Sequence, residues 1–207
     1  MVTIKEMPYK EKYAGVLFYY QILEGFAPRL VKEELGEKKV AELREIWKKE
    51  SETIPEGPSD QDRYEIAYRN FMKNWVSAHN FMREHRDEVG ATRFLQEAVL
   101  GWHHRYSGDA RLLKLVGSVS RKTAFKTLAK QLAYKLQVFS PFVVSELNGN
   151  RMVLTVNPCK IPEMPAGSEF CSLACQNIIP HWLESQFKII MNPTRHGANC
   201  AVTFEPL

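Results

Sequence analysis

The residues of this chain whose type and spacing could do chemistry are its four cysteines. They are Cys159, Cys171, Cys175 and Cys200, and all of them lie in the last quarter of the 207-residue sequence. Cys171 and Cys175 are four residues apart in a stretch that predicts a helix, so their side chains should share one face. Cys159 follows a predicted strand and Cys200 begins another. We therefore expect the four thiols to line one pocket between a helix and a sheet.

Three interpretations of that pocket stay open on the residues alone. The four thiols, or three of them with His196, could hold zinc, but zinc modules generally use a close ligand pair on both sides, so no metal is favoured. A nucleophile could be Cys171, in the first turn of its helix, or Cys200 with His196 as its base. Glu169 is a carboxylate that could orient such a histidine. Cysteine is also often a buried packing residue, and Cys175 lies in an apolar stretch.

The first two thirds of the sequence predict helices that must support this pocket. Apolar residues recur there at three- and four-residue steps, as on one buried helix face. Pro28 could bend or divide the first helix, and residues 54–58 form the clearest linker. The aromatic stripe of the third helix, which includes Phe71 and Trp75, should be core. The predicted helices are 13–35, 37–54, 60–88, 91–106 and 120–137.

A small mixed unit is predicted from Asn148 onward, because Asn-Gly signals a hairpin turn between strands 139–147 and 152–156. A helix over 169–185, bent at Pro180, should follow. Strands 187–191 and 201–204 should then flank a turn at 192–198. The sequence therefore predicts an α+β fold, with a helical amino-terminal portion followed by a small antiparallel sheet and a cysteine-bearing helix. We expect a helical portion over 1–147 and a cysteine-containing portion over 148–207, joined in one compact body.

The composition limits which binding partners and which cellular compartment are expected. The chain has 44% hydrophobic and 25% charged residues, as globular proteins do, and no stretch near the roughly 18 apolar residues of a membrane helix. No signal-peptide core is evident, so we expect a cytoplasmic protein with reduced thiols and no membrane partner. The net charge is +4, and basic residues are dense over 105–135. Without stacking aromatics or a glycine cradle, a solvated helix face is favoured over nucleic-acid binding. A small molecule is the expected partner, and a homo-oligomer is left open.

Three segments around the cysteines carry a resemblance to known families. They read Val156-Asn-Pro-Cys159, Phe170-Cys171-Ser-Leu-Ala-Cys175 and Pro193-Thr-Arg-His-Gly-Ala-Asn-Cys200-Ala-Val-Thr-Phe204. Together they resemble the L-2-amino-thiazoline-4-carboxylate hydrolase family and, more distantly, the 4-vinyl reductase type of small-molecule-binding domain. The shared pattern is a strand ending in a cysteine, a cysteine-bearing helix, and a final strand entered through a Gly-x-x-Cys turn. The stretch 20–49 is similar to the helical start of the hydrolase family.

The hydrolase resemblance implies opening of a small cyclic substrate, such as a thiazoline, at a carbon–nitrogen bond without an organic cofactor. Cys200 or Cys171 would be the attacking or substrate-binding thiol, and His196 the proton shuttle. Asn192 or Asn199 would donate a hydrogen bond to developing charge. The 4-vinyl reductase resemblance implies a domain that binds a small apolar ligand against Trp182, with zinc on the cysteines and no catalysis. The expected substrate contacts are Cys159, Cys175, Glu169, Asn192 and Trp182.

Overall fold

Two compact units make up the chain in the computed structural model, which describes residues 4–117, 121–139, 142–156, 159, 168, 171–197 and 199–207. One unit is Pro8–Trp102. The other consists of Met1–Met7 and His103–Leu207. The sequence prediction placed a boundary after residue 147, whereas the two units meet after Trp102.

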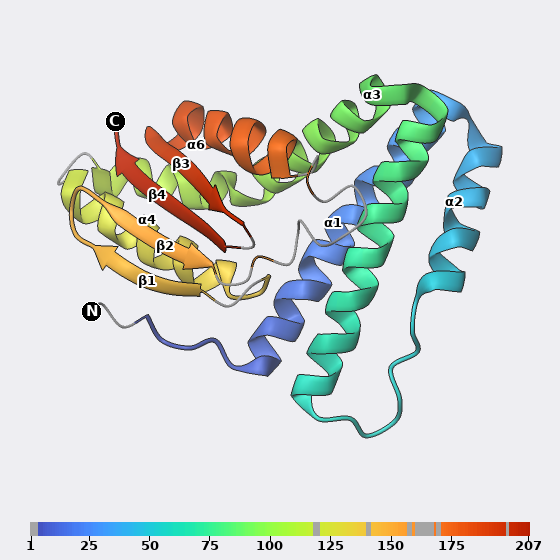
Figure 1. The fold of residues 1–207 in the computed structure, drawn as a ribbon, viewed down its shortest axis with the longest axis horizontal. Coiled ribbons are helices and arrows are strands. Elements are labelled where there is room, and N and C mark those ends of the chain that lie inside the picture. Colours follow the sequence, from blue (N-terminus) through green and yellow to red (C-terminus); the bar gives the residue numbers. More distant parts are fainter. Residues whose placement is uncertain are drawn as a thin grey trace. The chain divides into compact units, whose positions relative to one another are not determined.

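The unit Pro8–Trp102 is helical (Figure 1). Helix α1 spans Tyr9–Leu35, α2 spans Glu37–Glu50, and α3 runs from Asp60 through Gly117 into the second unit. Pro28 lies inside α1 without dividing it. Its neighbours Ala27 and Leu30 are buried, so packing on both sides of the proline holds the helix where one backbone hydrogen bond is missing.

Aromatic rings form the core of this helical unit. Phe94 is fully buried, and its ring centroid lies 5.1 Å from that of Phe26 and 5.3 Å from that of Trp75. Phe71 also packs against Trp75, with 5.7 Å between ring centroids. The prediction that the aromatic stripe of α3 is core is confirmed for Phe71 and Trp75, since both are buried.

Helix α3 is broken near the end that the sequence predicted for its first part. Arg86 (φ −141°, ψ 19°) and Asp87 (φ 52°, ψ −154°) leave the helical conformation, and the helix then resumes. Glu34 at the end of α1 binds across this break. Its largely buried carboxylate accepts from Arg86 at 2.8 Å and from Arg93 beyond the break. The second part of α3 ends at Gly117, well beyond the predicted end at 106.

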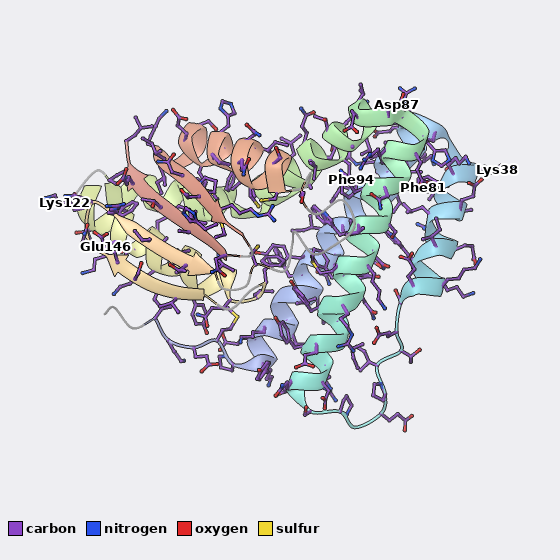
Figure 2. All side chains as sticks on the ribbon, in the orientation of Figure 1. Lys38, Phe81, Asp87, Phe94, Lys122 and Glu146 are labelled. Atoms are coloured by element: carbon purple, nitrogen blue, oxygen red, sulfur yellow. The ribbon has the colours of Figure 1, made fainter. Side chains whose placement is uncertain are left out.

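We expect Asp87→Gly to stabilise the protein by about 1 kcal/mol. Asp87 is exposed at the bend (Figure 2), and its backbone occupies a region that glycine adopts readily and a residue with a Cβ does not. Urea unfolding measures the change. Asp87→Ala is the control, because it removes the carboxylate but keeps the Cβ. An equal gain in both variants would show that the carboxylate, not backbone strain, is responsible.

A four-stranded antiparallel sheet lies in the second unit (Figure 1). Its strands are β1 Phe142–Leu147, β2 Met152–Val156, β3 Ile189–His196 and β4 Asn199–Pro206, in the order β1-β2-β4-β3. The predicted hairpin at Asn148 is confirmed. The Asn148 side-chain oxygen accepts the backbone N–H of Asn150 at 2.8 Å and of Arg151 at 2.9 Å, which closes the turn.

The last hairpin is tighter than predicted. β3 continues through Pro193 to His196, which pairs with Asn199, so the turn expected over 192–198 is wrong in its extent. Pro193 fits because β3 is at the edge of the sheet, where a strand can lack an N–H on its outer side. Gly197 in the turn has φ 62°, a conformation that favours glycine.

Helices cover one face of this sheet. They are α4, Arg121–Leu136, the π-helix η2, Cys171–Ile178, and α6, Ile179–Phe187. The predicted helix 169–185 thus changes from π to α just before Pro180, which has no N–H to donate. The buried core between helices and sheet consists of Phe125, Ala129, Ala133, Val144, Leu147, Met152, Leu154, Leu183, Ile189 and Phe204. Because strand side chains alternate, Val143 and Ile190 lie on the opposite face, where both are exposed.

The fold is α+β, as the sequence predicts: mostly helical, with a small antiparallel sheet in the carboxy-terminal part. Residues of α4 and β1 share a core with the later strands, which places these elements in the second unit. Over the residues that the structure describes, no helix combines the length and the apolar character needed to cross a membrane.

Candidate thiol site

Cys200 and Arg195 lie side by side at one end of the helix-covered face of the sheet. Cys200 is paired with Val156 of β2 and with Arg195 of β3, and paired residues point to the same face. Two alternations along β4, Phe204 is buried in the core, which identifies this face. The Arg195 Nε–H donates to the backbone oxygen of Gly197 at 2.9 Å, so the turn helps to position the guanidinium.

The π-helix η2 brings two further thiols to the same place. Cys171 is the first residue of η2 and is only 8% exposed, while Cys175 is partly buried. Hydrogen bonding between the two thiols is the largest cause of the pKa shift of each. The other two predicted thiols, Cys159 and Cys200, also raise the pKa of Cys175 through their charge. π-Helical turns re-aim side chains and frequently occur at functional sites.

Of Cys171, Cys175 and Cys200, Cys171 ionises first. The hydrogen bond donated by Cys175 is the main cause that lowers the pKa of Cys171, to about 6. Burial acts against it, and the positive charge of Arg195 adds a smaller lowering of the same pKa. At neutral pH Cys171 is therefore mostly a thiolate, which is the nucleophilic form of cysteine.

Cys175 and Cys200 stay protonated when Cys171 is ionised. The hydrogen bond to the Cys171 sulfur raises the pKa of Cys175 well above its ordinary value, and burial and the neighbouring thiols raise it further. Burial is the main cause that raises the pKa of Cys200, followed by Cys159 and Cys171, while Arg195 acts in the opposite direction. The site thus holds one thiolate beside protonated thiols, which suits a nucleophile with an adjacent proton donor.

We expect Cys175→Ala to raise the pKa of Cys171 and to slow its alkylation near neutral pH by roughly tenfold or more. Alanine cannot donate a hydrogen bond to the thiolate, whereas the hydroxyl of the matched variant Cys175→Ser can. The measurement is the pH dependence of alkylation at Cys171, followed by peptide mass spectrometry. If the inflection stays near that of the unmodified protein in Cys175→Ala, the hydrogen bond is not what stabilises the thiolate.

His196 and Asn192 do not face the thiols. His196 pairs with Asn199 and Asn192 pairs with Thr203, so both lie on the opposite face from Cys200, and both are exposed. The sequence expected His196 to reach Cys200 across the turn. The structure does not bring these two residues together, because adjacent residues of a strand point to opposite faces.

Trp182 and Glu169 are the remaining residues that the sequence predicted to contact a substrate. Trp182 of α6 packs against the sheet core, and its ring meets Phe187 edge-on at 5.1 Å between centroids. Glu169 lies outside the described residues. Among the residues that the structure describes, no three or more histidine, cysteine, aspartate or glutamate side chains are grouped to hold a metal ion.

Arg195 is the site residue that sequence reasoning missed. Its positive charge lowers the pKa of Cys171 and opposes the rise in the pKa of Cys200. A signal for it was present, since in a tight hairpin centred on Gly197 the residues Arg195 and Cys200 are placed opposite each other. The predicted turn over 192–198 includes Arg195, so that prediction did not pair Arg195 with Cys200.

Comparison with known proteins gives no significant match to a family model, a curated protein or a solved structure.

Proposed function

We propose that this chain is a hydrolase that opens a small cyclic substrate, of the thiazoline type, at a carbon–nitrogen bond, with Cys171 as nucleophile. The observation that carries the proposal is the hydrogen-bonded pair in which Cys171 is a thiolate near neutral pH and Cys175 remains protonated. A thiolate beside a proton donor is the minimum that cysteine-based hydrolysis needs. The resemblance of the three cysteine segments supplies the substrate class.

The reaction can be written for a protonated amidine ring with atoms and charges in balance. The Cys171 thiolate adds to the ring carbon and forms a carbon–sulfur bond. Cys175 gives its proton to the ring nitrogen as the carbon–nitrogen bond breaks. Water then adds to the same carbon, one of its protons returns to Cys175, and the carbon–sulfur bond breaks to restore the thiolate. The other proton leaves with the product, so one water molecule is consumed per turnover.

Cys200 and Arg195 have supporting roles in this proposal. Cys200 faces the same end of the sheet as Arg195 and keeps its proton, so it is a weak hydrogen-bond donor to the substrate. Arg195 favours the ionised Cys171 and restores that charge state after each turnover. His196 has no step, since it lies on the opposite face. The proposal places the protein in the cytoplasm, where the thiols stay reduced.

The test is a hydrolysis assay with 2-amino-thiazoline-4-carboxylate and ring-substituted analogues. Anaerobically purified protein is incubated with each compound in oxygen-18 water, and mass spectrometry detects ring-opened product carrying one labelled oxygen. Labelled product that forms with protein and not with buffer supports the proposal. Absence of turnover on all cyclic amidines tested would overturn it.

A binding protein similar to 4-vinyl reductase domains is the other outcome to be tested, because Cys159, Cys171 and Cys200 all act on the pKa of Cys175. Elemental analysis of the same sample distinguishes the two. Near-stoichiometric zinc together with slow thiols would favour the binding function. No bound metal and one fast thiol would favour the hydrolase.

A further inference from the structure

We propose that Asn148 is a modification site, which loses its side-chain amide as ammonia and becomes aspartate or isoaspartate, and that this change weakens the β1–β2 hairpin. Asn148 precedes Gly149, and the sequence contains no second Asn-Gly pair. Asn148 is exposed in the turn between β1 and β2, so water can reach it. This chemistry needs neither the thiol site nor the proposed hydrolysis.

The backbone nitrogen of Gly149 is the nucleophile of this reaction. A residue without a Cβ leaves its own backbone nitrogen open to the side chain that precedes it. The fold also requires glycine here, because a Cβ on Gly149 would lie 3.0 Å from the Cβ of Lys122 on α4. Figure 2 labels Lys122 and Glu146, which flank this turn. Within the described part of the chain the Gly149 N–H donates no hydrogen bond, so it has none to break before it reacts.

Two backbone N–H groups already point at the oxygen on which negative charge would develop. The Asn148 Oδ1 atom accepts the N–H of Asn150 at 2.8 Å and the N–H of Arg151 at 2.9 Å. Attack on the amide carbon turns this oxygen into an oxyanion, and donors held in place at such distances stabilise that charge. The same bonds fold the side chain over the backbone of the turn, which keeps the amide carbon near the next nitrogen.

The reaction proceeds through a five-membered ring, and its atoms balance with one water molecule. Hydroxide removes the proton of the Gly149 N–H, and the nitrogen forms a bond to the amide carbon of Asn148. The bond from that carbon to Nδ2 then breaks, and the nitrogen takes a proton from water and leaves as ammonia. Water opens the resulting succinimide at either carbonyl, which yields aspartate or isoaspartate. No electron is gained or lost.

The product carboxylate would meet a second carboxylate. In the unmodified protein the Asn148 Nδ2–H donates to Oε1 of Glu146 at 2.8 Å, and a carboxylate has no proton to donate there. Arg151 compensates only in part, because its Nε lies 3.7 Å from Glu146 and is shared with Glu205 at 3.5 Å. Lys122, beside Gly149, is the other charged group at this turn among the described residues. Like charges at hydrogen-bond distance therefore weaken the end of the hairpin.

The first test follows the modification on the full chain. The protein is incubated in oxygen-18 water at mildly alkaline pH and then digested briefly with trypsin, which cleaves after Lys135 and Arg151. Peptide 136–151 contains Asn148 and Asn150, and fragment spectra separate the two. We expect labelled carboxylate at Asn148 and not at Asn150. Because two donors serve the oxyanion, Asn148 should react roughly tenfold faster in the folded protein than in the isolated peptide.

Two results of this test would overturn the proposal. One is a rate at Asn150 equal to that at Asn148, which would remove any role for Gly149. The other is a slower reaction in the folded protein than in the peptide, because the turn would then protect Asn148.

The second test compares Asn148→Asp with the matched variant Asn150→Asp. Both variants add one carboxylate to the same exposed turn, but the Asn148 side chain faces Glu146. Above about pH 5, where both carboxyl groups are ionised, we expect Asn148→Asp to unfold at lower urea concentration than Asn150→Asp. Equal midpoints at that pH would refute the weakening of the hairpin.

Discussion

Replacing Cys171 with serine is expected to abolish the fast-reacting thiol near neutral pH and to lower the proposed hydrolysis by roughly a thousandfold or more. The hydroxyl of serine does not ionise in this range, so no nucleophile remains. In the unmodified protein, thiol reactivity should rise as the pH rises through the Cys171 pKa of about 6 and level off above it, because the thiolate is the reactive form. In Cys171→Ser, the reactivity of Cys175 and Cys200 should begin only at higher pH, since burial raises the pKa of both and does not depend on Cys171.

The control for this experiment is Cys200→Ser. Cys200 is partly buried and is protonated near neutral pH, so its loss should leave the low-pH inflection of Cys171 in place. Circular dichroism of both variants shows whether the fold is kept. A fast thiol that survives in Cys171→Ser and disappears in Cys200→Ser would assign the nucleophile to Cys200 and refute the assignment to Cys171.

Phe94→Ala is expected to lower the free energy of unfolding by about 3–5 kcal/mol. The side chain is fully buried and meets the rings of Phe26 and Trp75, so removing it leaves a cavity that the neighbouring aromatic residues cannot fill. Figure 2 shows Phe94 on α3 next to the chain of α1. Urea unfolding, followed by the fluorescence change of tryptophan, measures the loss.

Leu100→Ala is the matched control on the same helix. Leu100 is 47% exposed, so its truncation should change the free energy of unfolding by less than about 1 kcal/mol. Similar losses for Phe94→Ala and Leu100→Ala would mean that the aromatic cluster does not carry the stability of this unit.

Most of the fold could be predicted from local sequence patterns. The errors of that prediction come from contacts between segments far apart in the sequence, which local patterns do not contain. Apolar spacing predicted the helices, and Asn148 with Gly149 predicted the first hairpin. The extent of β3 was missed because proline normally ends a strand, and only the edge position makes Pro193 acceptable. Local patterns also do not contain the packing of the helix over 121–136 on the sheet that follows it.

The sequence predicted which thiols belong to the candidate site. It did not predict which of them is ionised or that Arg195 contributes a positive charge. The four-residue spacing of Cys171 and Cys175 was enough to place them together. Which thiol ionises depends on a sulfur–sulfur hydrogen bond in a π-helix, and the hydrogen-bond pattern of that helix is not visible in residue types. The register of β3 on β4 decides which face of the sheet His196 and Arg195 point to. A change of one residue in the length of the turn would move each side chain to the opposite face.

The proline in β3 has a consequence for how this protein can associate. An exposed sheet edge offers its free N–H and C=O groups to other chains and so invites fibril-like growth. Pro193 interrupts the row of donors on the outer side of β3, and the exposed Arg195 adds a charge close by. Strand-to-strand addition between copies is thus disfavoured at the β3 edge of the sheet, whereas β1, the other edge strand, contains no proline.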